Sequence, residues 1–178
     1  MQTDKQFFVK IVIAALLLPL LGCVSQRQRA NDKAEIDKHF DDVRNKFNAK
    51  RATLEQLLEM SKQDYAQNKV IRIAPDFTRL ENNWAWPRPD NEWGISAARW
   101  SEYRKLFDSI TLPFGIQRDG KDYSEVLFPF LGEGSIIASH DIGVVFSPNA
   151  PSDQHNKEQV LLYKKLSDNW YFYDWDRW

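Results

Sequence analysis

Apolar residues recur every three or four positions between residues 32 and 64, the spacing of the buried face of an amphipathic helix. The members of this series are Ile36, Phe40, Val43, Phe47, Leu54, Leu57 and Leu58. Lys50 and Ser61 stand where the series would continue, so it is interrupted. The pattern therefore predicts one long helix over 32–64 or two shorter helices with a break near 48–52.

A second amphipathic helix is predicted from Ser96 to about Ser109. Ser96 can cap its first turn with a side-chain oxygen. One face carries Trp100, Tyr103, Phe107 and Ile110, which is the face expected to pack against the rest of the domain.

Short runs with strand-like composition surround this helix. The predicted strands are 70–74, 77–80, 115–118, 124–131, 135–139, 143–147, 159–166 and 170–175. Turn residues separate several of them at 119–120, 132–134 and 168–169, and a longer polar loop spans 148–158. Pro129 inside a strand predicts an edge or a bulge there. The expected fold is α+β, with a long or broken N-terminal helix and one further helix packed on an antiparallel sheet of about five or six strands.

The last predicted strand is aromatic on both faces. Because side chains alternate along a strand, Trp170 and Phe172 share one face, and Tyr171, Tyr173 and Trp175 share the other. Such a strand is either covered on both faces or presents one of them to a partner.

The residues before position 24 follow another pattern. Lys5 and Lys10 accompany an apolar run that ends at Leu21, and the small residue Gly22 follows, which is the order of parts in a signal peptide. A short transmembrane helix and an ordinary cleaved signal are the alternatives. The run contains Lys10 and is shorter than the roughly 20 uninterrupted apolar residues that span a bilayer.

Leu20, Leu21, Gly22 and Cys23 together resemble the lipobox of bacterial lipoproteins, and Cys23 is the only cysteine of the chain. The resemblance implies a signal peptide over 1–22 and lipidation of Cys23. The polar residues after Cys23 show no periodicity, so 23–31 is predicted to be the lipidated cysteine and a tether, and the remaining length suits a single domain over 32–178. Because Val24 stands where an aspartate would retain the protein in the inner membrane, the resemblance also implies the periplasmic face of the outer membrane. The 100–107 helix and the 115–118 and 170–173 strands are similar to uncharacterised bacterial envelope proteins, which implies no activity.

The charge and composition of the chain limit the classes of partner that it is expected to bind. The chain has 24 basic and 25 acidic residues, and without residues 1–22 its net charge is −2, so nothing favours nucleic acid. The segment NNWAWPRPDNEWG over 82–94 is predicted to be a loop, and its rigid prolines could present aromatic rings. Its candidate binding residues are Trp84, Trp86, Arg88 and Trp93, facing a protein, peptide or glycan. The alternative is a lid folded over the sheet.

Candidate catalytic residues are sparse. His140, beside Asp141 and near Ser135 and Ser139, could act as a general base. Adjacent strand residues diverge, however, so His140 and Asp141 are expected to be a turn pair. Glu35, His39 and Asp42 lie along one helix face and are expected to be solvated. We therefore predict no catalytic residues, metal or cofactor.

The leading hypothesis is a lipid-anchored, noncatalytic binding module of the periplasm, with an immunity-like or assembly role. Its partners would be the membrane, through the anchor, and a periplasmic protein or glycan. The alternative hypothesis is an envelope hydrolase that uses His140 as general base.

Overall fold

The computed structural model describes the backbone of residues 4–81, 83–84, 94–134, 139–155 and 159–177, and the side chains of 34–81, 94–132, 140–154 and 159–176. The chain forms two units, Met1–His39 and Phe40–Trp178. Helix α1, Asp4–Asn68, contributes to both. Within the described residues, no helix has an apolar stretch of membrane-spanning length.

Helix α1 is continuous through residues 48–52, which confirms the long helix and excludes the alternative of two shorter helices. The residues that interrupt the apolar series do not break the helix, because Lys50 is exposed and Ser61 is buried with a hydrogen-bond partner. Helix α1 also includes residues 24–30. That segment contains no glycine or proline that would end a helix.

Nine strands of the described residues form a single sheet in the second unit, ordered β3-β2-β1-β4-β5-β6-β9-β8-β7, with antiparallel pairing between all neighbours. The strands are β1 Val70–Ile73, β2 Thr78–Leu80, β3 Asn83–Trp84, β4 Ile116–Asp119, β5 Glu125–Gly134, β6 Ser139–Phe146, β7 Gln154–His155, β8 Gln159–Ser167 and β9 Trp170–Arg177. Strands β3 and β7 have only two residues each, and the other seven form an open sheet. The α+β class is confirmed, with somewhat more strands than predicted.

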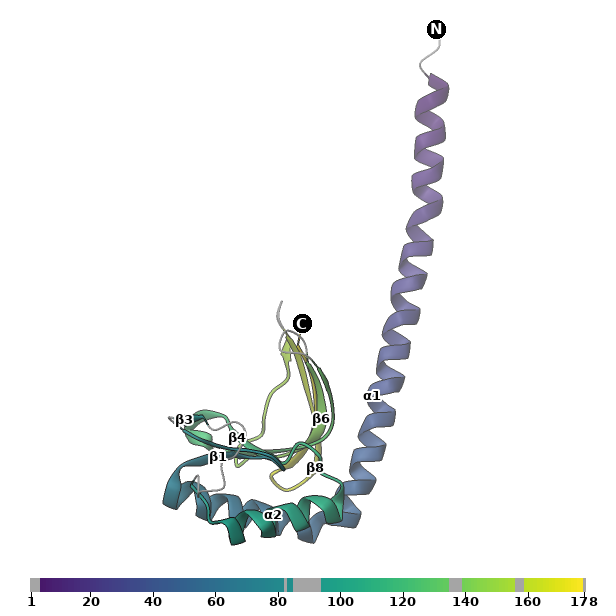
Figure 1. The fold of residues 1–178 in the computed structure, drawn as a ribbon. Helices are drawn as coiled ribbons and strands as arrows, with labels where there is room; N and C mark the ends of the chain where they lie inside the picture. Colours follow the sequence, from purple (N-terminus) through teal and green to yellow (C-terminus); the bar gives the residue numbers. More distant parts are fainter. Residues whose placement is uncertain (1–3, 82, 85–93, 135–138, 156–158, 178) are drawn as a thin grey trace. The chain divides into compact units, whose positions relative to one another are not determined.

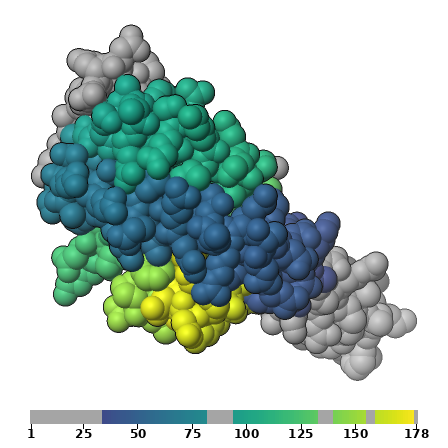
Figure 2. All heavy atoms as spheres, turned by 90° about the horizontal axis from the view of Figure 1, so that it is seen from below, coloured from purple at the N-terminus to yellow at the C-terminus, as the bar shows by residue number. Residues whose placement is uncertain are grey.

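Two helices cover one face of this sheet, α1 from Phe40 onward and α2, Ala97–Ile110 (Figure 1). Seen from that side, the two helices lie next to each other, and β9 borders α1 (Figure 2). The Phe40 ring packs edge-on against Phe172 with centroids 5.6 Å apart, and Phe47 packs against Trp170 at 5.5 Å. The helix-facing aromatic residues of β9 therefore form the centre of the core.

Local signals placed α2 correctly. The Ser96 side chain accepts a hydrogen bond from the Arg99 backbone N–H at 3.1 Å, and the helix ends at Thr111, whose φ is +55°. The turn predicted at 132–134 is wrong, because β5 continues to Gly134 and pairs with β6. The register shift between Pro129 and Leu131 confirms the predicted bulge. Residues 135–138 of the predicted 135–139 strand lie outside the described residues.

Candidate binding site

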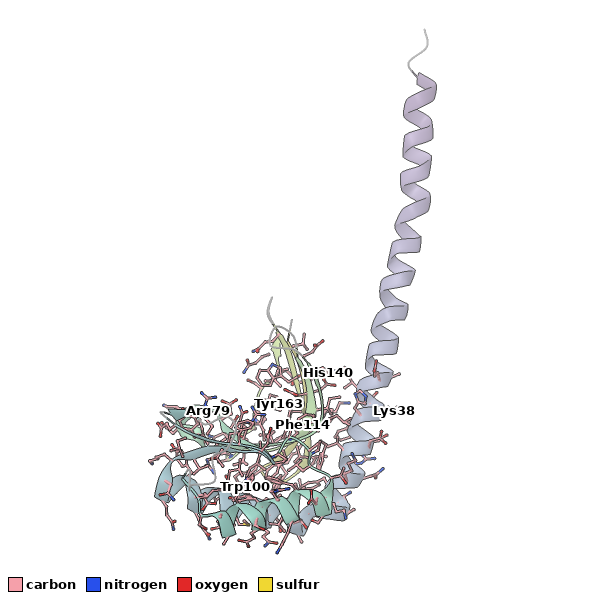
Figure 3. All side chains as sticks on the ribbon, in the orientation of Figure 1. Lys38, Arg79, Trp100, Phe114, His140 and Tyr163 are labelled. Atoms are coloured by element: carbon pink, nitrogen blue, oxygen red, sulfur yellow. The ribbon has the colours of Figure 1, made fainter. Side chains whose placement is uncertain are left out.

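The second aromatic face of β9 lies on the side of the sheet opposite the helices. Tyr171 and Tyr173 are buried there with Val145 of β6. Partly buried side chains of β5, β8 and β9 pack around this group, namely Leu127, Leu161, Tyr163 and Trp175. Figure 3 places Tyr163 on this side and Trp100 on the side of α2. We call this surface the open face.

A hollow of about 210 Å³ is formed on the open face between the β4–β5 turn and strands β8 and β9. Its wall combines carboxylates, aromatic rings and an aliphatic side chain: Asp119, Glu125, Leu127, Tyr163, Tyr173 and Trp175. This larger hollow is partly open to solvent, and it has the mixed apolar and polar lining that ligand sites have.

A smaller hollow of about 70 Å³ adjoins it and shares Leu127, Tyr173 and Trp175. Arg72 of β1 and Asp141 of β6 supply its charges. Burial lowers the pKa of the Arg72 guanidinium, and the Asp141 carboxylate opposes that shift. The two hollows therefore differ in charge. The charged side chains that line the larger hollow are all acidic, whereas the smaller hollow has one basic and one acidic side chain.

Tyr173 lies where the two hollows meet. Only 1% of its surface is exposed, and within the described residues its hydroxyl has no hydrogen-bond partner. Burial raises the pKa of Tyr173 well above its ordinary value, and the Asp141 carboxylate adds to the shift.

Tyr163 forms the opposite wall of the larger hollow. Burial, followed by the carboxylates of Glu125 and Asp119, raises the pKa of Tyr163 to about 12. Its backbone N–H donates to Asp153 Oδ1 at 2.7 Å, which holds β8 against the loop before β7. The Trp175 indole N–H donates to Gln159 Oε1 at 3.2 Å, so this ring is also oriented.

The two carboxylates of the larger hollow, those of Asp119 and Glu125, are oriented by hydrogen bonds to neighbouring groups of the domain. Asp119 Oδ1 accepts from the Gly120 N–H at 2.8 Å. Glu125 Oε1 lies 2.9 Å from the Ser147 hydroxyl, whose single proton is shared between this carboxylate and the Asn149 carbonyl at 2.6 Å. Gly120 has a φ of +75°, and a Cβ there would approach the Glu125 Cγ to 2.8 Å. Only glycine fits this turn without displacing Glu125.

His140 does not belong to this site. It lies within β6, so the predicted turn pair with Asp141 is wrong, and its Nε2 lies 2.8 Å from Asp174 Oδ1. Asp174 projects from β9 on the helix-facing side, as Phe172 does, whereas Asp141 lines the smaller hollow. The His140–Asp174 pair and the hollows therefore lie on opposite faces of the sheet.

The other predicted site residues fall mostly outside the described part. The backbone of Trp84 forms β3, whereas Trp86, Arg88 and Trp93 lie outside the described residues, as does the side chain of Cys23. Within the described side chains, no group of three or more His, Cys, Asp or Glu is placed to hold a metal.

Sequence reasoning missed the hollows, although the aromatic alternation of β9 pointed to them. Tyr173 and Trp175 were assigned to a face that is either covered or presented to a partner, and that face lines both hollows. The acidic side chains come from a β-turn that looks ordinary in sequence. Comparison with models of known protein families, with curated proteins and with solved structures finds no match.

Proposed function

We propose that this protein is a lipid-anchored, noncatalytic binding module of the bacterial envelope, and that its ligand occupies the open face of the sheet. One observation carries the binding part of the proposal. Tyr173, 1% exposed, lines both hollows, and within the described residues its hydroxyl has no hydrogen-bond partner. A ligand or an ordered water would supply that hydrogen bond.

The envelope location is supported by the sequence. Cys23 follows an apolar run and a small residue, as the modified cysteine of a lipobox does. Each buried methylene contributes about 0.8 kcal/mol to membrane attachment, so more than one acyl chain would anchor the domain stably. Val24 supports the outer membrane, with the domain on its periplasmic side.

Binding is supported over catalysis by the groups that line the hollows. They are neutral phenols, an indole, amides, carboxylates and one arginine, which recognise ligands by hydrogen bonding and ring contacts. The hydrolase hypothesis has one observation in its favour, the 2.8 Å contact that orients His140 through Asp174. That pair lies on the other face of the sheet from Tyr173, so it would need a second site of its own.

Photo-crosslinking in intact envelopes tests the proposal. A benzoyl-phenylalanine at Gln154, an exposed residue at the rim of the larger hollow, is expected to give a discrete adduct. The same probe at Asp168, whose side chain is 99% exposed in the β8–β9 turn, is the control and is expected to give none.

A second substitution links the adduct to the hollow. Leu127→Phe adds a ring where the two hollows meet and is expected to abolish the adduct at position 154 without unfolding the protein. Equal adducts from both probes, or no adduct from either, would overturn the binding proposal. Cys23→Ser is expected to abolish lipid labelling, and labelling that persists would refute the anchor.

A further inference from the structure

We propose that the larger hollow receives a primary ammonium group at the end of an alkyl chain. This inference deepens the proposed function and rests on it, because it states the chemistry of the ligand of the same site. The shared chemistry has two possible sources, a free alkyl diamine and the lysine side chain of a peptide.

The first step is the charge of the hollow. Asp119 and Glu125 are direct cross-strand partners in the β4–β5 pair. Like charges in this position repel each other and destabilise a sheet. Within the described residues neither carboxylate forms an ion pair, and no basic side chain lines the larger hollow. A cation between the two carboxylates would remove the repulsion.

The second step is the supply of hydrogen-bond acceptors. Asp119 and Glu125 each use one oxygen internally, for Gly120 and Ser147, and their other oxygens accept no hydrogen bond within the described residues. One oxygen of each carboxylate therefore remains as an acceptor in the larger hollow. An ammonium group has N–H donors and no acceptor, so it matches these acceptors in kind.

The third step separates an organic cation from a metal ion. Three aromatic rings line the hollow, those of Tyr163, Tyr173 and Trp175. Aromatic faces attract ammonium groups, whereas calcium takes six to eight oxygen ligands and magnesium retains several waters. The apolar side chains of Leu127 and Leu161 in the same wall would contact an alkyl stem.

Size gives the fourth step. The volume of about 210 Å³ is below the roughly 300–1,000 Å³ of pockets that enclose a drug-sized ligand. The hollow therefore accepts one side-chain-sized group and leaves the rest of the ligand outside. Arg72, in the adjoining smaller hollow, opposes a second cation there and restricts the ammonium group to the larger one.

Calorimetric titration of the full chain in detergent micelles tests the inference with four probes: 1,5-diaminopentane, Nα-acetyl-lysine methylamide, its neutral analogue Nα-acetyl-norleucine methylamide, and calcium chloride. At least one of the two amines is expected to bind, and the amine that binds identifies the source. The neutral analogue is expected to bind at least about tenfold more weakly than the lysine amide if a peptide is the source.

Charge-neutral variants locate the binding. Glu125→Gln and Asp119→Asn keep the oxygens that accept from Ser147 and Gly120, so the fold is expected to remain intact. Each is expected to weaken amine binding about tenfold. Glu59→Gln, an equivalent change at an exposed position of α1, is the matched control and is expected to leave binding unchanged.

Three results would overturn the inference: no binding of either amine, equal binding of the lysine and norleucine amides, or calcium binding without amine binding. Unchanged amine affinity in both charge-neutral variants would also overturn it. If the crosslink at position 154 still forms in any of these cases, the binding module stands and only the ammonium chemistry is refuted.

Discussion

Removing one buried carboxylate between the two helices should destabilise the domain substantially. Asp64 of α1 is 6% exposed, and its Oδ2 accepts from the Tyr103 hydroxyl at 2.6 Å and from Arg99 Nε at 3.1 Å. In Asp64→Ala both donors of α2 lose this acceptor. Tyr103 is fully buried, so its hydroxyl cannot turn to solvent instead.

The size of the effect follows from the two donors. A buried hydroxyl left without a partner costs about 1–3 kcal/mol. Arg99 keeps contacts with Glu102, Gln63 and the Met60 carbonyl and is 23% exposed, so its share is smaller than the 3–5 kcal/mol that a fully buried broken pair costs. We expect Asp64→Ala to lower the free energy of unfolding by about 3 kcal/mol.

Urea unfolding followed by tryptophan fluorescence measures the loss. Tyr103→Phe alone should cost about 1 kcal/mol, because Asp64 keeps Arg99. The loss in free energy of unfolding for the double variant, Asp64→Ala with Tyr103→Phe, should be smaller than the sum of the two single losses by about 1 kcal/mol or more. The reason is that the hydroxyl that Asp64→Ala leaves without a partner is absent when residue 103 is Phe. Asp41→Ala, which breaks an exposed ion pair of the same helix, is the control and should cost less than about 1 kcal/mol. Additive losses, or a loss below 1 kcal/mol for Asp64→Ala, would refute this explanation.

Three further predictions concern the sheet. Trp170→Ala, at a residue enclosed by Phe47, Phe128 and Phe146, should lower the free energy of unfolding by about 3–5 kcal/mol in the same assay, whereas Trp175→Ala should mainly weaken ligand binding. Gly120→Ala should destabilise the fold by about 1–3 kcal/mol and reduce amine affinity, measured by urea unfolding and calorimetry. The raised pKa of Tyr163 stabilises the neutral phenol, so its contribution should be complete below pH 10 and lost as the pH rises to about 12; ultraviolet titration of wild type and Tyr163→Phe measures it.

Elements whose signals are local were predicted well. The start of α2 depends on one cap, Ser96, and the turn between β8 and β9 on Asp168 and Asn169, where Asn169 adopts a φ of +60°. Each of these signals lies within the segment that it determines. The sequence therefore predicts these elements almost to the residue.

The extent of β5 could not be predicted in this way. Gly132 and Gly134 favour a turn by their composition, but a Cβ at Gly132 would approach Asp141 Oδ1 to 2.7 Å and the Phe114 ring to 3.2 Å. This glycine is therefore required by close packing with segments distant in the sequence. Local turn propensity is indistinguishable from such a requirement until the tertiary contacts are known.

The candidate site depends on the same kind of distant contact. The alternation of side chains along β9 correctly places Phe172 on one face of the sheet and Tyr173 and Trp175 on the other. It does not predict which of the two faces the helices cover. The hollows also need Arg72, Glu125 and Tyr163, which come from three different strands. Their convergence is set by strand order, and no spacing in the sequence records it.

The arrangement of β9 gives the proposed function its physical basis. Trp170 and Phe172 pack on α1 and fix the strand from the helix side, so the position of Tyr173 does not depend on the presence of a ligand. A buried phenol held in this way is preorganised, and binding would cost little further ordering of the site. Substitutions on the two faces should therefore separate, those facing α1 changing stability and those facing the hollows changing affinity.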